Sequence, residues 1–84
     1  MRSSRLMTKY FFHKRDGSEL VEDEEGTDLP DLEAARNEAI LAAREMMAEM
    51  VLEGKVVDGQ QFEITSEDGS TVDIVTFKSA IKLA

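Results

Sequence analysis

The segment KYFFHKRDGSELV, residues 9–21, places an Asp-Gly pair between two stretches that carry large apolar side chains. Asp-Gly in this setting is a strong signal for a β-hairpin, because glycine readily adopts the positive φ angle that hairpin turns require. The same arrangement returns in FEITSEDGSTVDIVTF, residues 62–77. We therefore expect two hairpins, with strands near residues 8–14, 19–22, 62–66 and 71–77.

The segment between the hairpins has the periodicity of an amphipathic helix. Asp31 is the favoured N-cap, with Asp28 as an alternative, and Gly54 is the expected stop signal, so the helix runs from residue 32 to residue 52 or 53. At 100° per residue its apolar stripe comprises Leu32, Ala35, Ala39, Ala42, Ala43, Met46, Met47 and Met50. We expect this stripe to face a sheet.

The order of elements predicts an α+β fold, ββαββ, with one long helix packed on a four-stranded, mostly antiparallel sheet. Phe62 and Ile64 alternate with polar residues, so both are expected to face the helix. The strands at residues 8–14 and 71–77 carry large apolar groups on both faces, and we expect them to be central.

The last strand has an irregular pattern. In a regular strand Val72 and Ile74 would point to one face, whereas Val75 and Phe77 would point to the other. Either a β-bulge shifts the register within this strand, or both of its faces are covered.

The 84 residues are expected to form a single domain over residues 7–84, preceded by a disordered extension at residues 1–6. No apolar run approaches the ~20 residues that span a bilayer, and no apolar stretch of about 7–15 residues follows the basic N-terminus. The chain contains no cysteine, which fits a reducing compartment. These features predict a cytoplasmic protein without a membrane partner.

The residue types do not predict an enzyme, a cofactor or a metal site. The single histidine, His13, lies on a predicted strand and is expected to be half-buried beside a polar group, and no serine occupies a strand-to-helix elbow. Aligning Gly26 with the glycine of an EF-hand loop places Val21 and Leu32 at ligand positions, so that template fails. A weak, non-standard cation site in the acidic loop stays open.

Nucleic acid is not an expected ligand. The net charge is −8, whereas binding to phosphates relies on lysine and arginine. Lys9, Phe11, His13 and Arg15 share one face of a strand and resemble a single-strand platform, but no second strand of this kind accompanies them.

Charge is divided unevenly along the first half of the chain. Residues 1–15 contain five bases and no acid, whereas residues 16–35 contain nine acids and no base. One interpretation is attraction between the two strands of the first hairpin. The other is an acidic surface, including Glu24 and Glu25, for a basic protein partner.

Two further surfaces are candidates for association. The first is the sheet face opposite the helix, where we expect Phe11 and His13 beside Val75 and Phe77, with Ile81 and Leu83 of the tail as the only cover. The second is a strip on the far side of the helix that contains Leu41 and Leu52. Monomers seldom expose apolar patches beyond a few hundred Å², so a homodimer is expected. The predicted partner surface thus comprises Phe11, His13, Val75, Phe77, Leu41, Leu52, Glu24 and Glu25.

Three sequence blocks carry a family resemblance: YFFHKRDG at residues 10–17, DEEG at residues 23–26 and LPDLEAAR at residues 29–36. Together they resemble a small bacterial family of unknown function, over residues 7–77. That resemblance implies no activity, cofactor or catalytic residue. A looser likeness is to HicB-type antitoxins, from which the chain departs by lacking a C-terminal DNA-binding element and continuing into a second hairpin.

The expected function is therefore a non-enzymatic protein-interaction or regulatory module that self-associates. The alternative is an inhibitor resembling HicB-type antitoxins, which would set its acidic surface against a basic partner.

Overall fold

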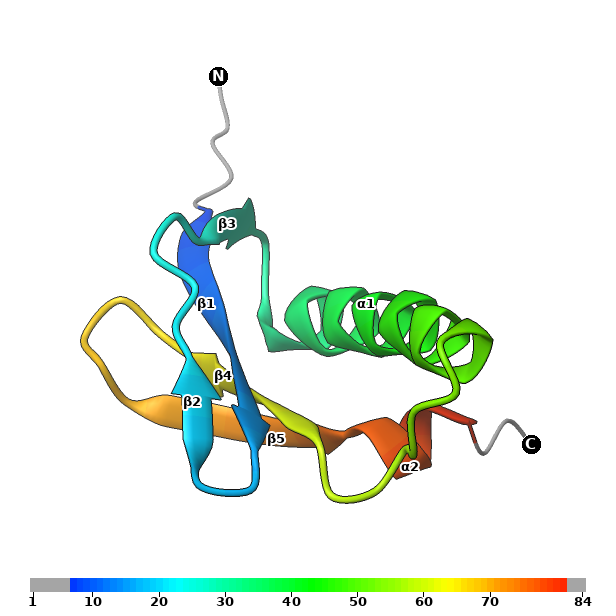
Figure 1. Ribbon diagram of the computed structural model, residues 1–84. Helices are drawn as coiled ribbons and strands as arrows, with labels where there is room; N and C mark the ends of the chain where they lie inside the picture. Colours follow the sequence, from blue (N-terminus) through cyan, green and yellow to red (C-terminus); the bar gives the residue numbers. More distant parts are fainter. Residues whose placement is uncertain (1–6, 82–84) are drawn as a thin grey trace.

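The computed structural model describes residues 7–81, which form one antiparallel five-stranded sheet and two helices (Figure 1). The elements are β1 (Thr8–Asp16), β2 (Glu19–Val21), β3 (Thr27–Leu29), α1 (Leu32–Leu52), β4 (Gln61–Thr65), β5 (Thr71–Thr76) and α2 (Phe77–Ile81). The strand order is β2-β1-β4-β5, and β3 also pairs with β1. The α+β class and the two hairpins around one long helix are confirmed, with β3 and α2 as additions. The predicted extension at residues 1–6 lies outside the described residues.

The central strands are β1 and β4, so the prediction that the strand at residues 71–77 is central was wrong. Within the described chain β5 lies at an edge of the sheet. A β-bulge in β5 accounts for its apolar residues at both odd and even positions. Ile64 pairs with Asp73 and Thr65 pairs with Thr71, which leaves Val72 without a partner.

The bulge decides which β5 side chains face the helix. Val75 and Phe77 are each 1% exposed and belong to the core, whereas Ile74 is 48% exposed. The expectation that Val75 and Phe77 lie on the uncovered face was therefore wrong. Val75 lies opposite Phe62, which shares its helix-facing side, and Ile74 takes the outward position.

The two ends of α1 are formed as predicted. Asp31 is the N-cap, and its Oδ1 accepts a hydrogen bond of 2.9 Å from the Ala34 N–H. At the other end Gly54 adopts a φ of 78°, while the N–H groups of Gly54 and Lys55 donate to the carbonyls of Val51 and Met50 at 3.0 and 2.8 Å. This is a Schellman arrangement, which satisfies carbonyls that the helix leaves free.

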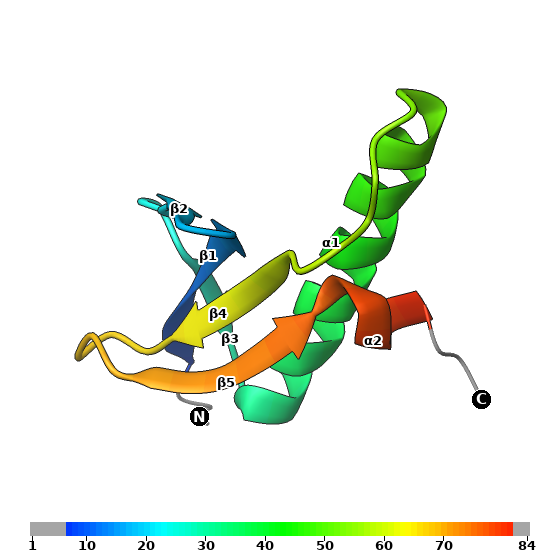
Figure 2. The ribbon, with the colours of Figure 1, turned by 60° about the horizontal axis from the view of Figure 1, so that its bottom comes forward.

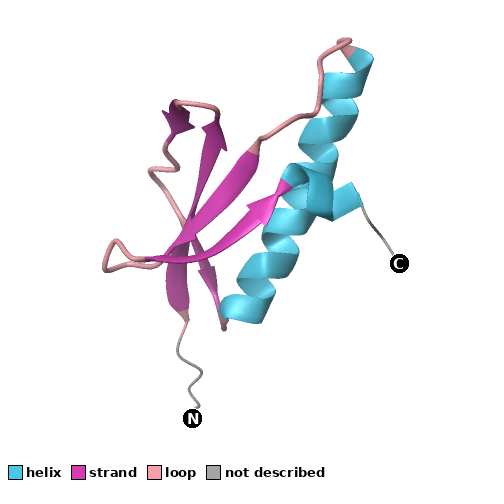
Figure 3. Cartoon of the chain, turned by 90° about the horizontal axis from the view of Figure 1, so that it is seen from below, coloured by secondary structure: helices cyan, strands magenta, loops and turns pink. Residues whose placement is uncertain are grey.

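Helix α1 packs on one face of the sheet through a stripe of small residues, and Figures 2 and 3 show its path across β4 and β5. Ala35, Ala39 and Ala43 are fully buried, and Met47 continues the stripe. Short side chains allow the helix backbone to approach the sheet closely, where it covers Ile64 and Phe62. Among residues 7–81, no helix is both long enough and apolar enough to cross a membrane.

The short helix α2 packs beside α1 rather than over the other face of the sheet. The Arg44 Nε donates to the Ala80 carbonyl at 3.1 Å, and the Ala80 side chain is buried. The tail therefore does not supply the predicted cover: Ile81 is exposed on the helical side, and Leu83 lies outside the described residues. The sheet face opposite α1 is left without a covering element among the described residues (Figure 1).

Two isoleucines of the sheet test this arrangement. Ile64→Ala should lower the free energy of unfolding by about 2–5 kcal/mol, because Ile64 is fully buried and the change leaves a cavity. Ile74→Ala is the matched control on the open face and should cost about 1 kcal/mol or less. Urea denaturation of both variants measures the difference, and equal losses would contradict the assigned faces.

Candidate functional site

The return strand of the first hairpin is interrupted by a large, irregular bulge. Val21 of β2 pairs with Lys14, and Thr27 of β3 pairs with Tyr10. Between these two pairs, residues 11–13 of β1 face residues 22–26, so the return strand carries two extra residues.

The Asp23 side chain fills this bulge. Its Oδ2 accepts a hydrogen bond of 3.1 Å from the Phe12 N–H, and its Oδ1 accepts from the N–H groups of Glu25 and Gly26, each at 3.2 Å. The Asp23 N–H in turn donates to His13 Nδ1 at 3.0 Å. The carboxylate thus takes the place of a missing strand carbonyl, and His13 is half-buried beside a polar group, as predicted.

The Asp23 carboxyl is held in its charged form. Burial raises its pKa, but the hydrogen bonds from the Phe12, Gly26 and Glu25 N–H groups outweigh burial and keep the pKa below the ordinary value. A negative charge is therefore fixed at the base of the bulge.

Gly26 shapes the other side of the bulge. Its φ is 72°, and a Cβ atom there would lie 2.7 Å from Lys9 Cγ and 2.9 Å from Phe11 Cε2. Both distances are shorter than a carbon–carbon contact allows, so only glycine lets the Phe11 ring lie against the loop.

A hollow of about 330 Å³ opens on the uncovered sheet face next to this bulge. We call it the sheet-face hollow; its lining residues are Phe11, His13, Glu22, Asp23, Glu24, Thr65, Ser66, Glu67 and Gly69. The Phe11 and His13 rings stack with nearly parallel planes, inclined by 19°, and their centroids are 6.2 Å apart.

The hollow unites residues that the sequence assigned to separate surfaces. Phe11 and His13 were predicted on the sheet face, and Glu24 was predicted in an acidic loop; here all three line one hollow. Glu25 is exposed but does not line it. Glu67 was missed, because only the pairing of β1 with β4 brings the second Asp-Gly turn to this place.

A second, apolar hollow of about 350 Å³ lies between the two helices. Arg44 is the one charged residue among those that line it, and the others are Met47, Ala48, Val51, Ala80 and Ile81. Leu41 and Leu52, which were predicted on the outer side of the helix, are both exposed there. They extend the apolar surface along α1.

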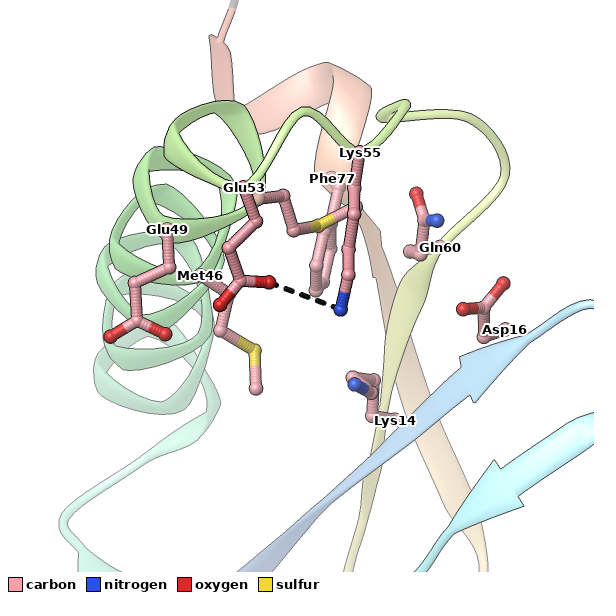
Figure 4. Close-up of a pocket in the computed structure, with 9 residues that line it drawn as sticks. Lys14, Asp16, Met46, Glu49, Glu53, Lys55, Gln60 and Phe77 are labelled. Atoms are coloured by element: carbon pink, nitrogen blue, oxygen red, sulfur yellow. Dashed lines mark ion pairs between the residues drawn. The ribbon is translucent and has the colours of Figure 1, made fainter.

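A third pocket, of about 290 Å³, lies between the end of α1 and the β1–β4 end of the sheet (Figure 4). Lys55 Nζ lies 3.1 Å from Glu53 Oε1, so these two charges neutralise each other at this pocket. Met46 and Phe77 contribute apolar walls. Across residues 7–81, no group of three or more His, Asp or Glu side chains is placed to hold a metal ion.

The bulge can be tested with Asp23→Asn. An amide cannot accept from all three N–H groups, so the change should lower the free energy of unfolding at neutral pH by about 1–3 kcal/mol. Because the pKa of Asp23 is depressed in the folded state, its stabilising effect is present above the ordinary value of 3.8 and is lost as the pH falls through the folded value. Urea titrations from pH 7 into the acid range should therefore show the wild type and the variant converging.

Glu24→Gln is the matched control for that measurement, because it removes the same charge from the neighbouring exposed residue. It should leave stability nearly unchanged at neutral pH. A difference between wild type and Asp23→Asn that persists unchanged into acid would contradict the role assigned to the carboxylate.

No match was found among curated proteins or among solved structures. A family model described as "Domain of unknown function (DUF6894)" matches residues 9–78, which include β1 except its first residue, the Asp23 bulge, α1 and the second hairpin. The expectation of a family of unknown function is confirmed, and the chain belongs to the DUF6894 family.

Proposed function

We propose that this protein is a non-enzymatic protein-interaction or regulatory module that self-associates through the outer surface of its two helices. The observation that carries the proposal is a group of exposed aliphatic side chains on the outer side of α1 and α2, here called the helical strip. Its members are Leu41, Ala48, Val51, Leu52 and Ile81. Val51 is 67% exposed and Leu52 is 87% exposed, which is costly in water unless a partner covers them.

The shape of the helical strip favours a second copy of the chain as its partner. The large side chains of Val51 and Ile81 line the same hollow as the small side chains of Ala48 and Ala80. A two-fold contact requires one patch to offer both the projections and the recesses. The charged side chain of Arg44 does not prevent such a contact, because its Nε already donates a hydrogen bond to the Ala80 carbonyl.

The edges of the sheet offer a poorer route to association. On β5 the Ile74 N–H donates to Asp73 Oδ1 at 2.8 Å, and Asp73 Oδ2 accepts from Arg36 Nη1 at 2.8 Å. The Arg36 hydrogen bond also lowers the pKa of Asp73, so this edge carries an ion pair whose carboxylate stays ionised. On the opposite edge β2 has only three residues and ends at the Asp23 bulge. Short, bulged and charged edges resist pairing with another chain.

A second candidate function follows from the acidic side of the sheet-face hollow. An inhibitor resembling HicB-type antitoxins would use such a surface against a basic protein. Glu22, Glu24 and Glu67 around the hollow supply the required charge.

Self-association can be tested by sedimentation. We expect the wild type to sediment as a dimer at high micromolar concentration, and Val51→Glu to raise the dissociation constant roughly tenfold or more, since a charge would be buried in the contact. Val56→Glu places the same charge on a valine that is 75% exposed outside the helical strip, so it should have no effect.

Two results would contradict the proposal: a wild type that remains monomeric at that concentration, or equal weakening by Val51→Glu and Val56→Glu. Circular dichroism of each variant checks that the chain remains folded.

A further inference from the structure

We propose that the open sheet face binds an arginine side chain from a basic segment of another protein, with the guanidinium seated in the sheet-face hollow. This site is separate from the helical strip, because α1 covers the opposite face of the sheet. Arginine binding at this site therefore does not depend on whether the protein is a monomer or a dimer. Its chemistry is set by two features: a pair of nearly parallel aromatic rings and an acidic rim.

The rings form the first feature. Phe11 and His13 are both half-buried, so part of each ring meets solvent. Their planes are nearly parallel, inclined by 19°, and their centroids are 6.2 Å apart along β1. The absence of a side chain at Gly26 lets the Phe11 ring lie against the loop, and the Asp23 N–H donates to Nδ1 of the His13 ring. A planar guanidinium stacks on aromatic rings, and it is more weakly hydrated than an ammonium group, so its burial against them costs less.

The rim forms the second feature. Glu22 and Glu24 reach the hollow from the bulge, while Glu67 reaches it from the β4–β5 turn. Acidic residues therefore border the hollow from two elements, which suits the several N–H donors of a guanidinium. None of the ion pairs formed within residues 7–81 involves Glu22, Glu24 or Glu67.

Two bases share this face of β1: Lys9, whose side chain lies beside Gly26, and Arg15, which is paired within the chain. The Arg15 Nε is 2.9 Å from Glu63 Oε2, and that hydrogen bond lowers the pKa of Glu63. The Arg15–Glu63 pair is therefore neutral as a unit. The Asp23 carboxylate adds a further fixed negative charge beneath the rim.

The same charges decide between possible occupants. A second copy of the chain would set one acidic rim against another, which is unfavourable. A nucleic acid would bring its phosphates to the same carboxylates. A basic protein segment has the complementary charge, and the guanidinium of arginine can also stack on aromatic rings.

The test uses the full chain and a short probe peptide, Gly-Arg-Gly-Arg-Gly, followed by the backbone amide signals in NMR. We expect the shifts to cluster at Phe11, His13, Thr65 and Gly69. The same peptide with glutamine in place of arginine should cause no such shifts, and the lysine peptide should bind more weakly because an ammonium stacks less well.

A pair of double variants isolates the rim from general charge attraction. Glu24→Gln with Glu67→Gln should weaken arginine binding by roughly threefold to tenfold. Glu38→Gln with Glu45→Gln removes the same total charge from exposed residues of α1 and should change it by less than about twofold. Unchanged thermal unfolding of both double variants confirms that they fold.

Phe11→Leu isolates the rings, since it keeps an apolar side chain but removes the aromatic face. It should reduce the preference for the arginine peptide over the lysine peptide. If Phe11→Leu altered the fold, the NMR chemical shifts of the free protein would also change outside the hollow.

Several outcomes would overturn the proposal: equal weakening by the two double variants, equal binding of the glutamine peptide, or shifts centred elsewhere. Movement of the hollow's signals when the protein alone is diluted would show that a second copy occupies the face instead. Val51→Glu leaves the hollow untouched, so failure of arginine binding and failure of self-association are separate results.

Discussion

One long helix can cover only one face of a sheet, and the rest of this structure follows from that constraint. The stripe of Ala35, Ala39 and Ala43 brings α1 close to Ile64, and all four residues are fully buried in the core. Because α2 joins α1 on the same side, the opposite face must be shaped by the strands themselves. Two bulges do this: the unpaired Val72 in β5 turns Val75 inward, and Asp23 closes the gap between β2 and β3.

Much of the fold could be predicted because its signals are local. Asp31 and Gly54 act within one turn of α1, and the alternation of Phe62 and Ile64 needs no partner to be recognised. The β5 bulge could not be placed in the same way. The sequence pattern admits either a bulge or two covered faces, and Val72 carries no local mark of the extra position. The prediction therefore exchanged the helix-facing and outward-facing side chains of residues 72–77.

The candidate site depends even more on contacts between distant residues. The aromatic and acidic residues near the first hairpin were recognised, but their convergence on one hollow was not. Asp23 accepts a hydrogen bond from the N–H of Phe12, which is 11 residues away in the sequence. Glu67 borders the hollow only because β4 pairs with β1. These contacts also give the sequence blocks a physical meaning: Phe12 and His13 belong to YFFH, whereas Asp23 and Gly26 belong to DEEG. The two blocks form one unit, since each supplies the hydrogen-bond partners of the other.

The placement of the two proposed surfaces has a consequence for how they would work together. The helical strip lies on the outer side of α1, and the sheet-face hollow lies on the face that α1 does not cover, so the two point away from each other. A dimer formed through the strip therefore leaves both hollows open. A partner with two basic segments would then bind the second hollow as an intramolecular step, at a high effective concentration. Weak recognition of a single arginine side chain would suffice for a stable complex, provided that the partner's segments can span the distance between the two copies.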